Sequence, residues 1–269
     1  MLKFARSMIA FPNIDPVAVQ LGPVAIHWYG IAYLVGIGLG WWFLLRDANR
    51  SDSDWSQEAV SDVVFFAALG GVFGGRIGYT LFYNFNETLS DPLNIFAVWR
   101  GGMSFHGGTL GFILALALFA HLRSRPLLAV TDFVTVVAPI GLFFGRIANF
   151  VNQELWGAPT TLPWGVVFTH PAAGLIARHP SQVYEALLEG LVLFILLRFV
   201  AAKCSLVGAV SATFLIAYGI MRIGIEFVRE PDQHIGYLAW GWVTMGQILS
   251  LPMILGGLII LGIAHSRRA

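Results

Sequence analysis

Residues 127–157 read LLAVTDFVTVVAPIGLFFGRIANFVNQELWG. The part from Leu127 to Phe144 is apolar and long enough to cross a bilayer as a helix, which takes about 20 residues. Arg146 lies at the end of this run, and an ionisable side chain within a membrane span usually faces a partner or a polar cavity. The stretch therefore predicts a membrane-spanning helix that ends in a functional site.

The polar residues at the end of this run share one side of the expected helix. If the helix continues to Gln153, a rotation of about 100° per residue brings Arg146, Asn149 and Gln153 within about 60° of one another. Glu154 lies about 80° to the other side of Arg146 on the same geometry. One helical face is then expected to present a guanidinium and amides, with the Glu154 carboxylate to one side.

The composition is that of an integral membrane protein. Of the 269 residues, 57% are hydrophobic and 12% charged, and the mean hydropathy is +0.73. So few charges cannot cover the surface of a soluble globule of this length. The net charge of +1 argues against nucleic acid as a partner. The single cysteine, Cys204, excludes an internal disulfide, and no histidines are paired at metal-ligand spacing, so we expect neither a metal nor another cofactor.

The expected fold class is an all-α polytopic membrane protein with seven transmembrane helices. The spans are predicted at about residues 24–45, 59–83, 109–120, 127–144, 183–200, 206–228 and 242–264. The third is short, so it must include part of the glycine-rich stretch before it.

Two further segments are expected outside the membrane core. Residues 1–23 contain three prolines and mixed polarity, which is typical of an arm lying on the membrane surface. Residues 151–182 contain four prolines that break any regular helix, so they are expected to form a small head. The predicted domains are thus the arm, spans one to four within 24–150, the head, and spans five to seven within 183–269.

Seven spans place the chain termini on opposite faces of the membrane. Half of the sixteen Lys and Arg residues fall on one face, all in short loops or tails: Arg46, Arg50, Arg123, Arg125, Arg198, Lys203, Arg267 and Arg268. By the positive-inside rule this face is cytoplasmic. We therefore predict that the C-terminus is cytoplasmic and that the N-terminus and the head lie on the opposite, outer side of the membrane.

Glycines and arginines recur in the outer halves of the even-numbered spans. The second span carries Arg76 among glycines that are expected to allow close helix packing, namely Gly70, Gly71, Gly74, Gly75 and Gly78. Packing does not explain Arg76 itself. Arg222 and Glu226 lie four residues apart in the sixth span and are interpreted as a structural ion pair.

Three candidate site features are expected on the outer side of the membrane. His106 lies between two glycine pairs at a membrane entrance, which makes it a candidate site residue. The 145–157 stretch and Arg229 are expected on the same side. Most basic residues there are embedded, which indicates an anionic headgroup entering from the lipid, because the planar fork of arginine matches phosphate.

Several segments resemble the bacterial prolipoprotein diacylglyceryl transferase family, and the match covers nearly the whole length. They are His27-Trp28-Tyr29-Gly30, Ser104-Phe105-His106-Gly107-Gly108, residues 145–157, His179-Pro180-Ser181-Gln182 with Tyr184-Glu185, residues 227–232, and Met245-Gly246-Gln247. The match is poorest at residues 158–178.

The resemblance implies a bacterial inner-membrane protein with seven transmembrane helices, a periplasmic N-terminus and a periplasmic head, in agreement with the topology above. It also implies a reaction and a set of site residues. The diacylglyceryl group of phosphatidylglycerol would move to the lipobox cysteine thiol of a prolipoprotein signal peptide, with release of glycerol 1-phosphate. The family's functional residues correspond to Tyr29, His106, Arg146, Asn149, Glu154, Gly157 and Arg229. The expected catalytic residues are His106, Arg146 and Arg229, and all the others, with the two arginines, are expected to bind substrate.

The implied chemistry suggests a role for each polar group. Attack of sulfur on the glyceryl carbon expels a phosphate monoester, and fixed cations at Arg146 and Arg229 would stabilise its developing charge. Asn149 and Tyr29 would orient the headgroup. A thiol with a pKa of about 8.5 is mostly protonated at neutral pH, so either His106 removes its proton or the arginines alone favour the thiolate.

Glu154 is expected to hold Arg146 in position rather than to act as a base, because a carboxylate beside a guanidinium stays ionised. The alternative function is a seven-span transporter or receptor that binds anionic lipid without chemistry. A retinal protein is disfavoured because the last span has no lysine for a Schiff base. A metal-dependent transferase is disfavoured because Asp132 stands alone on its span.

Overall fold

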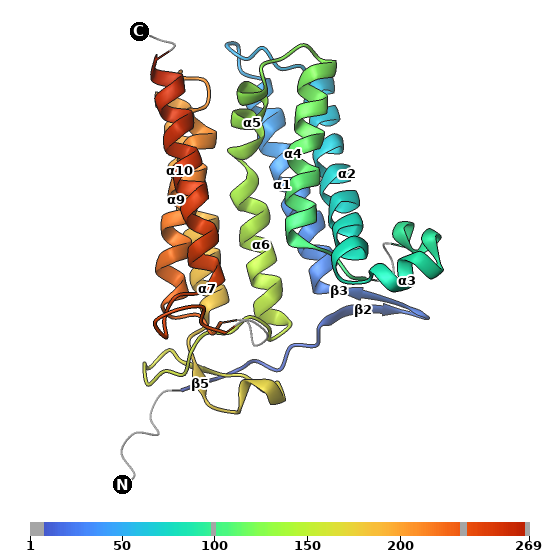
Figure 1. Cartoon of the computed structure of the whole chain (residues 1–269), viewed down its shortest axis with the longest axis vertical. Coiled ribbons are helices and arrows are strands. Elements are labelled where there is room, and N and C mark those ends of the chain that lie inside the picture. The colour runs from blue at the N-terminus through green and yellow to red at the C-terminus, as the bar shows by residue number, and fades with distance from the viewer. Residues whose placement is uncertain (1–7, 98–100, 232–235, 267–269) are drawn as a thin grey trace. The chain divides into compact units, whose positions relative to one another are not determined.

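The computed structural model describes residues 8–97, 101–231 and 236–266. The chain divides into two compact units, one made of residues 1–40 and 135–269 and the other of residues 41–134. The helices and strands are numbered in chain order in Figure 1.

The described residues include five helices that are long and apolar enough to cross a membrane. These are α1 (Trp28–Ala48), α2 (Gln57–Phe82), α4 (Phe105–Leu122), α9 (Ala209–Glu226) and α10 (Met245–Ser266). A sixth is counted if α5 (Leu127–Thr135) and α6 (Ala138–Val151) form one span. The protein is therefore mainly helical and crosses the membrane several times.

The predicted fourth span is bent rather than straight. Its two helices meet at an angle of 45°. Pro139 lies in the first turn of α6, where the missing N–H of proline costs no helical hydrogen bond. A new helix therefore begins at the break.

The same span extends past its predicted end at residue 144, and α6 stops at Val151. It does not reach Gln153, which has a φ of +53°, so the condition for a shared helical face of Arg146, Asn149 and Gln153 is not met. The backbone turns away at this point to begin the head.

The predicted fifth span is a continuous helical run of three segments, the middle one of which is a π-helix. It consists of α7 (Ser181–Glu185), a π-helix (Ala186–Val192) and α8 (Leu193–Lys203). π-Helical turns are rare and occur often at functional sites.

The predicted first span begins four residues too early. Residues Val24–His27 form strand β3, which pairs antiparallel with β2 (Val17–Leu21). Gly22 has a φ of +58° in the turn between the strands, a conformation that suits glycine. The helix therefore starts only at Trp28.

In the unit of residues 41–134, α2 packs closely against α4. An added Cβ at Gly70 or Gly74 would lie 2.5 or 2.4 Å from a backbone oxygen of α4, and one at Gly78 would lie 2.7 Å from Gly107 Cα. This confirms the predicted packing role of these three glycines, whereas Gly71 has open space beside it. The unit also contains α3 (Phe85–Ser90) and a 3₁₀ helix (Pro92–Phe96).

In the other unit, α9 and α10 run side by side (Figure 1). Close packing there depends on Gly219 and Gly257, where an added Cβ would meet Ile254 Cγ1 at 2.7 Å and Ala212 O at 2.8 Å.

The head contains a small sheet and an aromatic core. Strand β4 (Val166–Val167) pairs parallel with β1 (Ile9–Ala10) and antiparallel with β5 (Ala177–Arg178). A short 3₁₀ helix at Pro171–Ala173 lies between β4 and β5 in the chain. Phe11 and Phe168 are buried in its core, and Phe150 at the end of α6 packs against them. The N-terminal segment thus completes the sheet, and the head is fixed to the end of α6.

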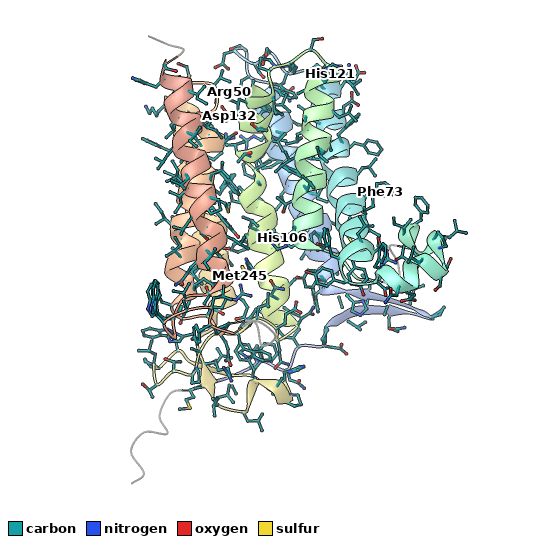
Figure 2. The ribbon with its side chains drawn as sticks, in the orientation of Figure 1. Arg50, Phe73, His106, His121, Asp132 and Met245 are labelled. Atoms are coloured by element: carbon teal, nitrogen blue, oxygen red, sulfur yellow. The ribbon has the colours of Figure 1, made fainter. Side chains whose placement is uncertain are left out.

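Large apolar side chains remain exposed along the long helices, among them Phe73 on α2 and Met245 at the start of α10 (Figure 2). Exposed apolar surface on this scale is unfavourable in water and is matched by lipid.

Candidate active site

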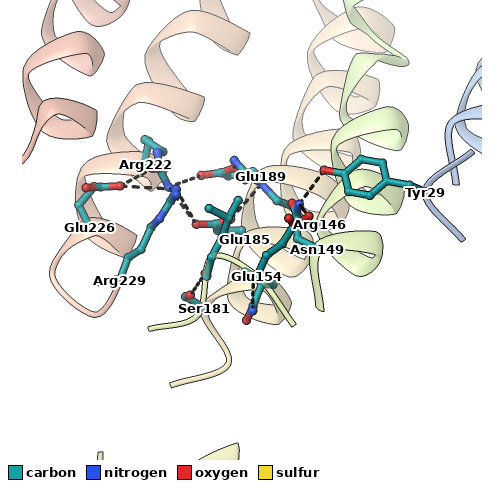
Figure 3. A network of polar contacts seen from close by, with 12 residues as sticks. Tyr29, Arg146, Asn149, Glu154, Ser181, Glu185, Glu189, Arg222, Glu226 and Arg229 are labelled. Carbon is teal, nitrogen blue, oxygen red and sulfur yellow. Dashed lines mark hydrogen bonds and ion pairs between the residues drawn. The ribbon is translucent and has the colours of Figure 1, made fainter. Parts of the chain in front are cut away.

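A buried cluster of three arginines and three glutamates lies in the unit of residues 1–40 and 135–269 (Figure 3). Its members come from α6, from the α7 and π-helical run, from α9 and from the residues just after α9: Arg146, Glu185, Glu189, Arg222, Glu226 and Arg229. Both Glu185 and Glu189 are fully buried. The six formal charges sum to zero.

Arg146 is paired with two carboxylates. Its Nε lies 2.9 Å from Glu185 Oε2 as an ion pair, and its Nη2 donates a hydrogen bond of 3.2 Å to Glu189 Oε2. Arg146 is on α6, so these contacts join α6 to the α7 and π-helical run.

Glu185 is the common partner of all three arginines. Its Oε1 accepts a hydrogen bond of 2.9 Å from Arg222 Nη1 and lies 3.5 Å from Arg229 Nη1, while Oε2 faces Arg146. Arg222 also pairs with Glu226 one helical turn further along α9, as predicted. That pair is therefore one edge of a larger network.

Arg229 is held near the cluster just outside α9. Burial lowers the pKa of its guanidinium from the usual value, and the charge of Arg222 acts in the same direction, whereas Glu185 and Glu226 raise it. Arginine nevertheless remains charged in proteins, so the cluster keeps three cations.

The π-helix and its glycine, Gly190, allow Glu189 to approach Arg146. An added Cβ at Gly190 would lie 2.6 Å from Phe143 Cβ and 2.9 Å from its Cα. The π-helix can therefore approach α6 this closely only with glycine at position 190. Glu189 and Arg146 lie beside this contact in their two helices.

A second branch of polar contacts begins at Asn149, one turn after Arg146 on α6. Its Nδ2 donates hydrogen bonds of 2.7 Å to Tyr29 Oη and of 2.7 Å to Glu154 Oε1. Asn149 is buried, so its amide orients both partners. The structure thus brings together three predicted site residues, Tyr29, Asn149 and Glu154.

Contrary to expectation, Glu154 forms no ion pair with an arginine among the residues that the structure describes. The carboxylate partners of Arg146 are Glu185 and Glu189, whereas Glu154 accepts its hydrogen bond from Asn149. The other predicted member of the helical face, Gln153, points into the head, where its Oε1 accepts hydrogen bonds from Thr169 and His170. The reason in both cases is the end of α6 at Val151, which redirects the following residues.

Gly157 connects the 145–157 stretch to the residues around Arg229. It forms an antiparallel bridge with Arg229, and Ala158 N donates to Val228 O at 2.9 Å. An added Cβ at Gly157 would lie 2.5 Å from Val228 O and 2.6 Å from His179 Cβ. Only glycine fits this crossing, so its role in the structure is to position Arg229.

We therefore expect Gly157→Ala to lower the transfer rate proposed below by about a hundredfold, because displacing a site residue by an ångström can cost that much. The measurement is the initial rate with the purified variant, together with its thermal midpoint in detergent. Gly224→Ala is the matched control, because an added Cβ there meets no atom within 4 Å. A Gly157→Ala variant as active as this control would contradict the positioning role.

The residues from 179 to 182 brace the turn before Gly157. Gln182 Nε2 donates to Glu154 O at 2.6 Å, and Ser181 Oγ donates to Leu155 O at 2.9 Å. His179 Nδ1 lies 3.3 Å from Tyr184 Oη, and burial lowers the pKa of the His179 imidazole, which favours its neutral form. The motif around these residues therefore supports the site from the head.

His106 belongs to the other compact unit. It lies in the first turn of α4 with an exposed side chain, and Ser104 Oγ caps this turn by accepting a hydrogen bond from Gly107 N. As predicted, the helix includes part of the glycine-rich stretch.

Sequence reasoning missed the carboxylates that organise the cluster. Glu185 and Glu189 are four residues apart on an apolar span, and this spacing could have indicated a shared partner. Arg222 was interpreted only as a partner of Glu226, although it also contacts Glu185. Within the described ranges, no group of three His, Cys, Asp or Glu side chains is arranged to hold a metal ion.

The cluster is a charge-balanced network that is held away from water. Burying six charges costs considerable desolvation, so the network is by itself weak evidence of stabilisation. Three guanidinium groups that converge on one place offer many donors to a phosphate. The fold and the cluster define a multi-pass membrane protein with a buried network of three arginines and three glutamates.

Comparison with known proteins identifies the family. The model of the prolipoprotein diacylglyceryl transferase family matches residues 16–263. Proteins named phosphatidylglycerol–prolipoprotein diacylglyceryl transferase are 51% identical in Pseudomonas syringae pv. syringae, over 97% of both chains, and 49% identical in Methylococcus capsulatus, over 97% of this chain and 100% of that one. The one from Pseudomonas aeruginosa strain PAO1 is 48% identical over 97% and 98%. The chain belongs to the prolipoprotein diacylglyceryl transferase family and is a transferase of lipoprotein biosynthesis.

Proposed function

We propose that this protein transfers the diacylglyceryl group of phosphatidylglycerol to the lipobox cysteine of prolipoproteins and releases glycerol 1-phosphate. Family membership supports the reaction. The observation that carries the proposal for the site is the convergence of Arg146, Arg222 and Arg229 on Glu185.

In this proposal the arginines bind the phosphate of the lipid. The carboxylates hold the guanidinium groups in place before substrate arrives, and the phosphate then competes for their donors. Arg146 and Arg229 keep the role predicted from the sequence, and Arg222 joins them because it shares Glu185 with both.

Tyr29, Asn149 and Glu154 form the neighbouring part of the same substrate-binding site. Asn149 fixes the Tyr29 hydroxyl and the Glu154 carboxylate. These groups provide hydrogen bonds to the glycerol hydroxyls of the headgroup. Gly157 contributes by keeping Arg229 in position.

The reaction is a displacement at the glyceryl carbon. The lipobox sulfur forms a bond to this carbon, the bond from the carbon to the phosphate oxygen breaks, and the electron pair leaves with glycerol 1-phosphate. Negative charge therefore grows on the phosphate, where fixed guanidinium groups lower the barrier. The thiol proton passes to His106, the general base in this proposal.

The proposed topology has seven spans, with the run from α7 to α8 as the fifth. The arm at residues 1–23 lies on the periplasmic surface, the head at 151–182 is periplasmic and the C-terminus is cytoplasmic. Short loops with Arg46, Arg50, Arg123 and Arg125 support this orientation by the positive-inside rule. Arg267 and Arg268 lie outside the described residues.

The role of His106 predicts a change in the pH profile. We expect His106→Gln to lower turnover by about a hundredfold at neutral pH, in the usual range for loss of a general base. The loss should shrink toward alkaline pH, where a thiol with a pKa of about 8.5 ionises without help. The measurement is the rate between pH 6 and about 9.5. Near-wild-type turnover at neutral pH would mean that the arginines suffice without a base.

The proposed function is tested by mass spectrometry of a lipobox peptide incubated with the purified protein and phosphatidylglycerol in detergent. We expect a diacylglyceryl mass gain on the cysteine, and none with a cysteine-to-serine peptide or with zwitterionic phosphatidylethanolamine. If folded protein binds the anionic lipid and gives no adduct, the non-catalytic lipid transporter or receptor becomes the better assignment.

A further inference from the structure

Arg76 is a buried cation that the proposed mechanism does not use. It lies on α2, and only 2% of its surface is exposed. Its Nη2 donates to Asn94 O at 2.6 Å and to Asn94 Oδ1 at 3.0 Å, and its Nη1 donates to Gly101 O and lies 3.4 Å from Gly102 O. One side chain thus holds together α2, the 3₁₀ helix and the loop before α4.

The partners of Arg76 are oxygens of neutral groups. Within the parts of the chain that the structure describes, no carboxylate forms an ion pair with it. Among the described residues, its charge faces carbonyl and amide dipoles and the ring of Tyr79, whose centre lies 5.6 Å from the guanidinium carbon. Burying a cation is costly, so these hydrogen bonds are needed to keep Arg76 inside the protein.

The loop held by Arg76 has a backbone that depends on glycine. Gly101 and Gly102 have φ values of +75° and +73°, and an added Cβ at Gly102 would lie 2.4 Å from Tyr79 Cε1. The carbonyls of these two glycines are the ones that face Arg76. The two glycines and the guanidinium of Arg76 therefore fix the backbone that leads into α4.

This path fixes the first turn of α4. Ser104 N donates to Gly75 O at 2.8 Å, and Ser104 Oγ accepts from Gly107 N at 3.2 Å. Gly78 contacts Gly107 directly. The turn that carries His106 is thus attached to α2 on both sides of Arg76, and Figure 2 labels His106 at this end of α4.

We propose that Arg76 is a positioning residue for the transfer reaction: by binding the loop carbonyls through Nη1 and Asn94 through Nη2, it fixes the first turn of α4 and the direction of the His106 side chain. The inference rests on the proposed role of His106 as a base. A lysine cannot replace it, because a single ammonium is a point charge without the planar fork.

The test is a double-mutant cycle with the full-length protein, combining Arg76→Lys and His106→Gln. We measure kcat, KM for phosphatidylglycerol and the thermal midpoint. Arg76→Lys is expected to lower kcat about tenfold and to leave KM unchanged. This loss is smaller than the roughly hundredfold loss that misplacing a catalytic group can cause. In the His106→Gln background the same substitution should have no further effect on kcat.

The controls separate positioning from folding. Arg123→Lys is the matched control, because Arg123 pairs with Asp62 in an exposed ion pair of the same unit, and wild-type kinetics are expected. If Arg76→Lys does not fold, Asn94→Ala replaces it, since it removes the Oδ1 acceptor of Arg76 and keeps the backbone acceptor. A smaller kcat loss of about threefold is then expected on the same cycle.

Two outcomes would overturn the inference. One is that the losses from Arg76→Lys and His106→Gln multiply, which would show that they act independently. The other is wild-type kcat for Arg76→Lys in folded protein. Failure of the proposed function is distinguishable from both, because the wild type itself would then give no adduct.

Discussion

Replacing Arg146 by alanine is expected to lower the rate of diacylglyceryl transfer by about a hundredfold or more, the typical cost of removing one donor to a developing oxyanion. Arg146 contacts both fully buried carboxylates, Glu185 at 2.9 Å and Glu189 at 3.2 Å. The measurement is the initial rate of adduct formation by mass spectrometry. A rate within a few-fold of wild type would exclude Arg146 from the transition state.

This substitution also leaves two buried carboxylates short of a counter-charge, which typically destabilises a protein by about 3–5 kcal/mol. A charge-balanced variant separates the two effects. Arg146→Gln combined with Glu189→Gln removes one charge of each sign and leaves Glu185 paired with Arg222 and Arg229. We expect this variant to keep a near-wild-type thermal midpoint and still to be inactive.

Glu185→Gln is expected to cause the largest loss of stability in the site, about 3–5 kcal/mol, because it removes the carboxylate that all three arginines share and leaves three cations with two anions. The measurement is the free energy of unfolding or the thermal midpoint of the purified protein. The direction follows from the complete burial of Glu185, where an unbalanced charge is not screened by water.

Glu154→Gln is the matched control for this prediction. Glu154 accepts one hydrogen bond from Asn149, and a glutamine oxygen can accept the same bond. We expect its stability to change by less than about 1 kcal/mol. Equal thermal midpoints for Glu185→Gln and the wild type would contradict the central position of Glu185.

The helices of this protein follow from local features of the sequence. Apolar runs in the sequence predicted the positions of α2, α9 and α10 to within a few residues, because a helix that crosses a membrane requires a long apolar run. Glycines four residues apart correctly indicated the close packing of α2 and α4. The strand before α1 was not predicted, because an apolar run of four residues suits a strand or a helix equally well.

The site was predicted less completely than the helices. Arg146 and Asn149 were singled out because polar groups at the end of an apolar helix are conspicuous. The partners of Arg146 were not predicted, since Glu185 and Glu189 lie about forty positions away and only tertiary packing brings them together. The π-helix that carries Glu189 and the turn at Gln153 have no local signal strong enough to predict them.

The central claim is that the buried arginines bind the phosphate that leaves with the glycerol. The most direct measurement is the rise in thermal midpoint on adding glycerol 1-phosphate, compared between wild type and the Arg146→Gln, Glu189→Gln variant. A ligand at about a hundred times its Kd stabilises the folded state by about 2.7 kcal/mol. We predict a clear rise for the wild type and none for the charge-balanced variant; an equal rise in both would contradict phosphate binding by this cluster.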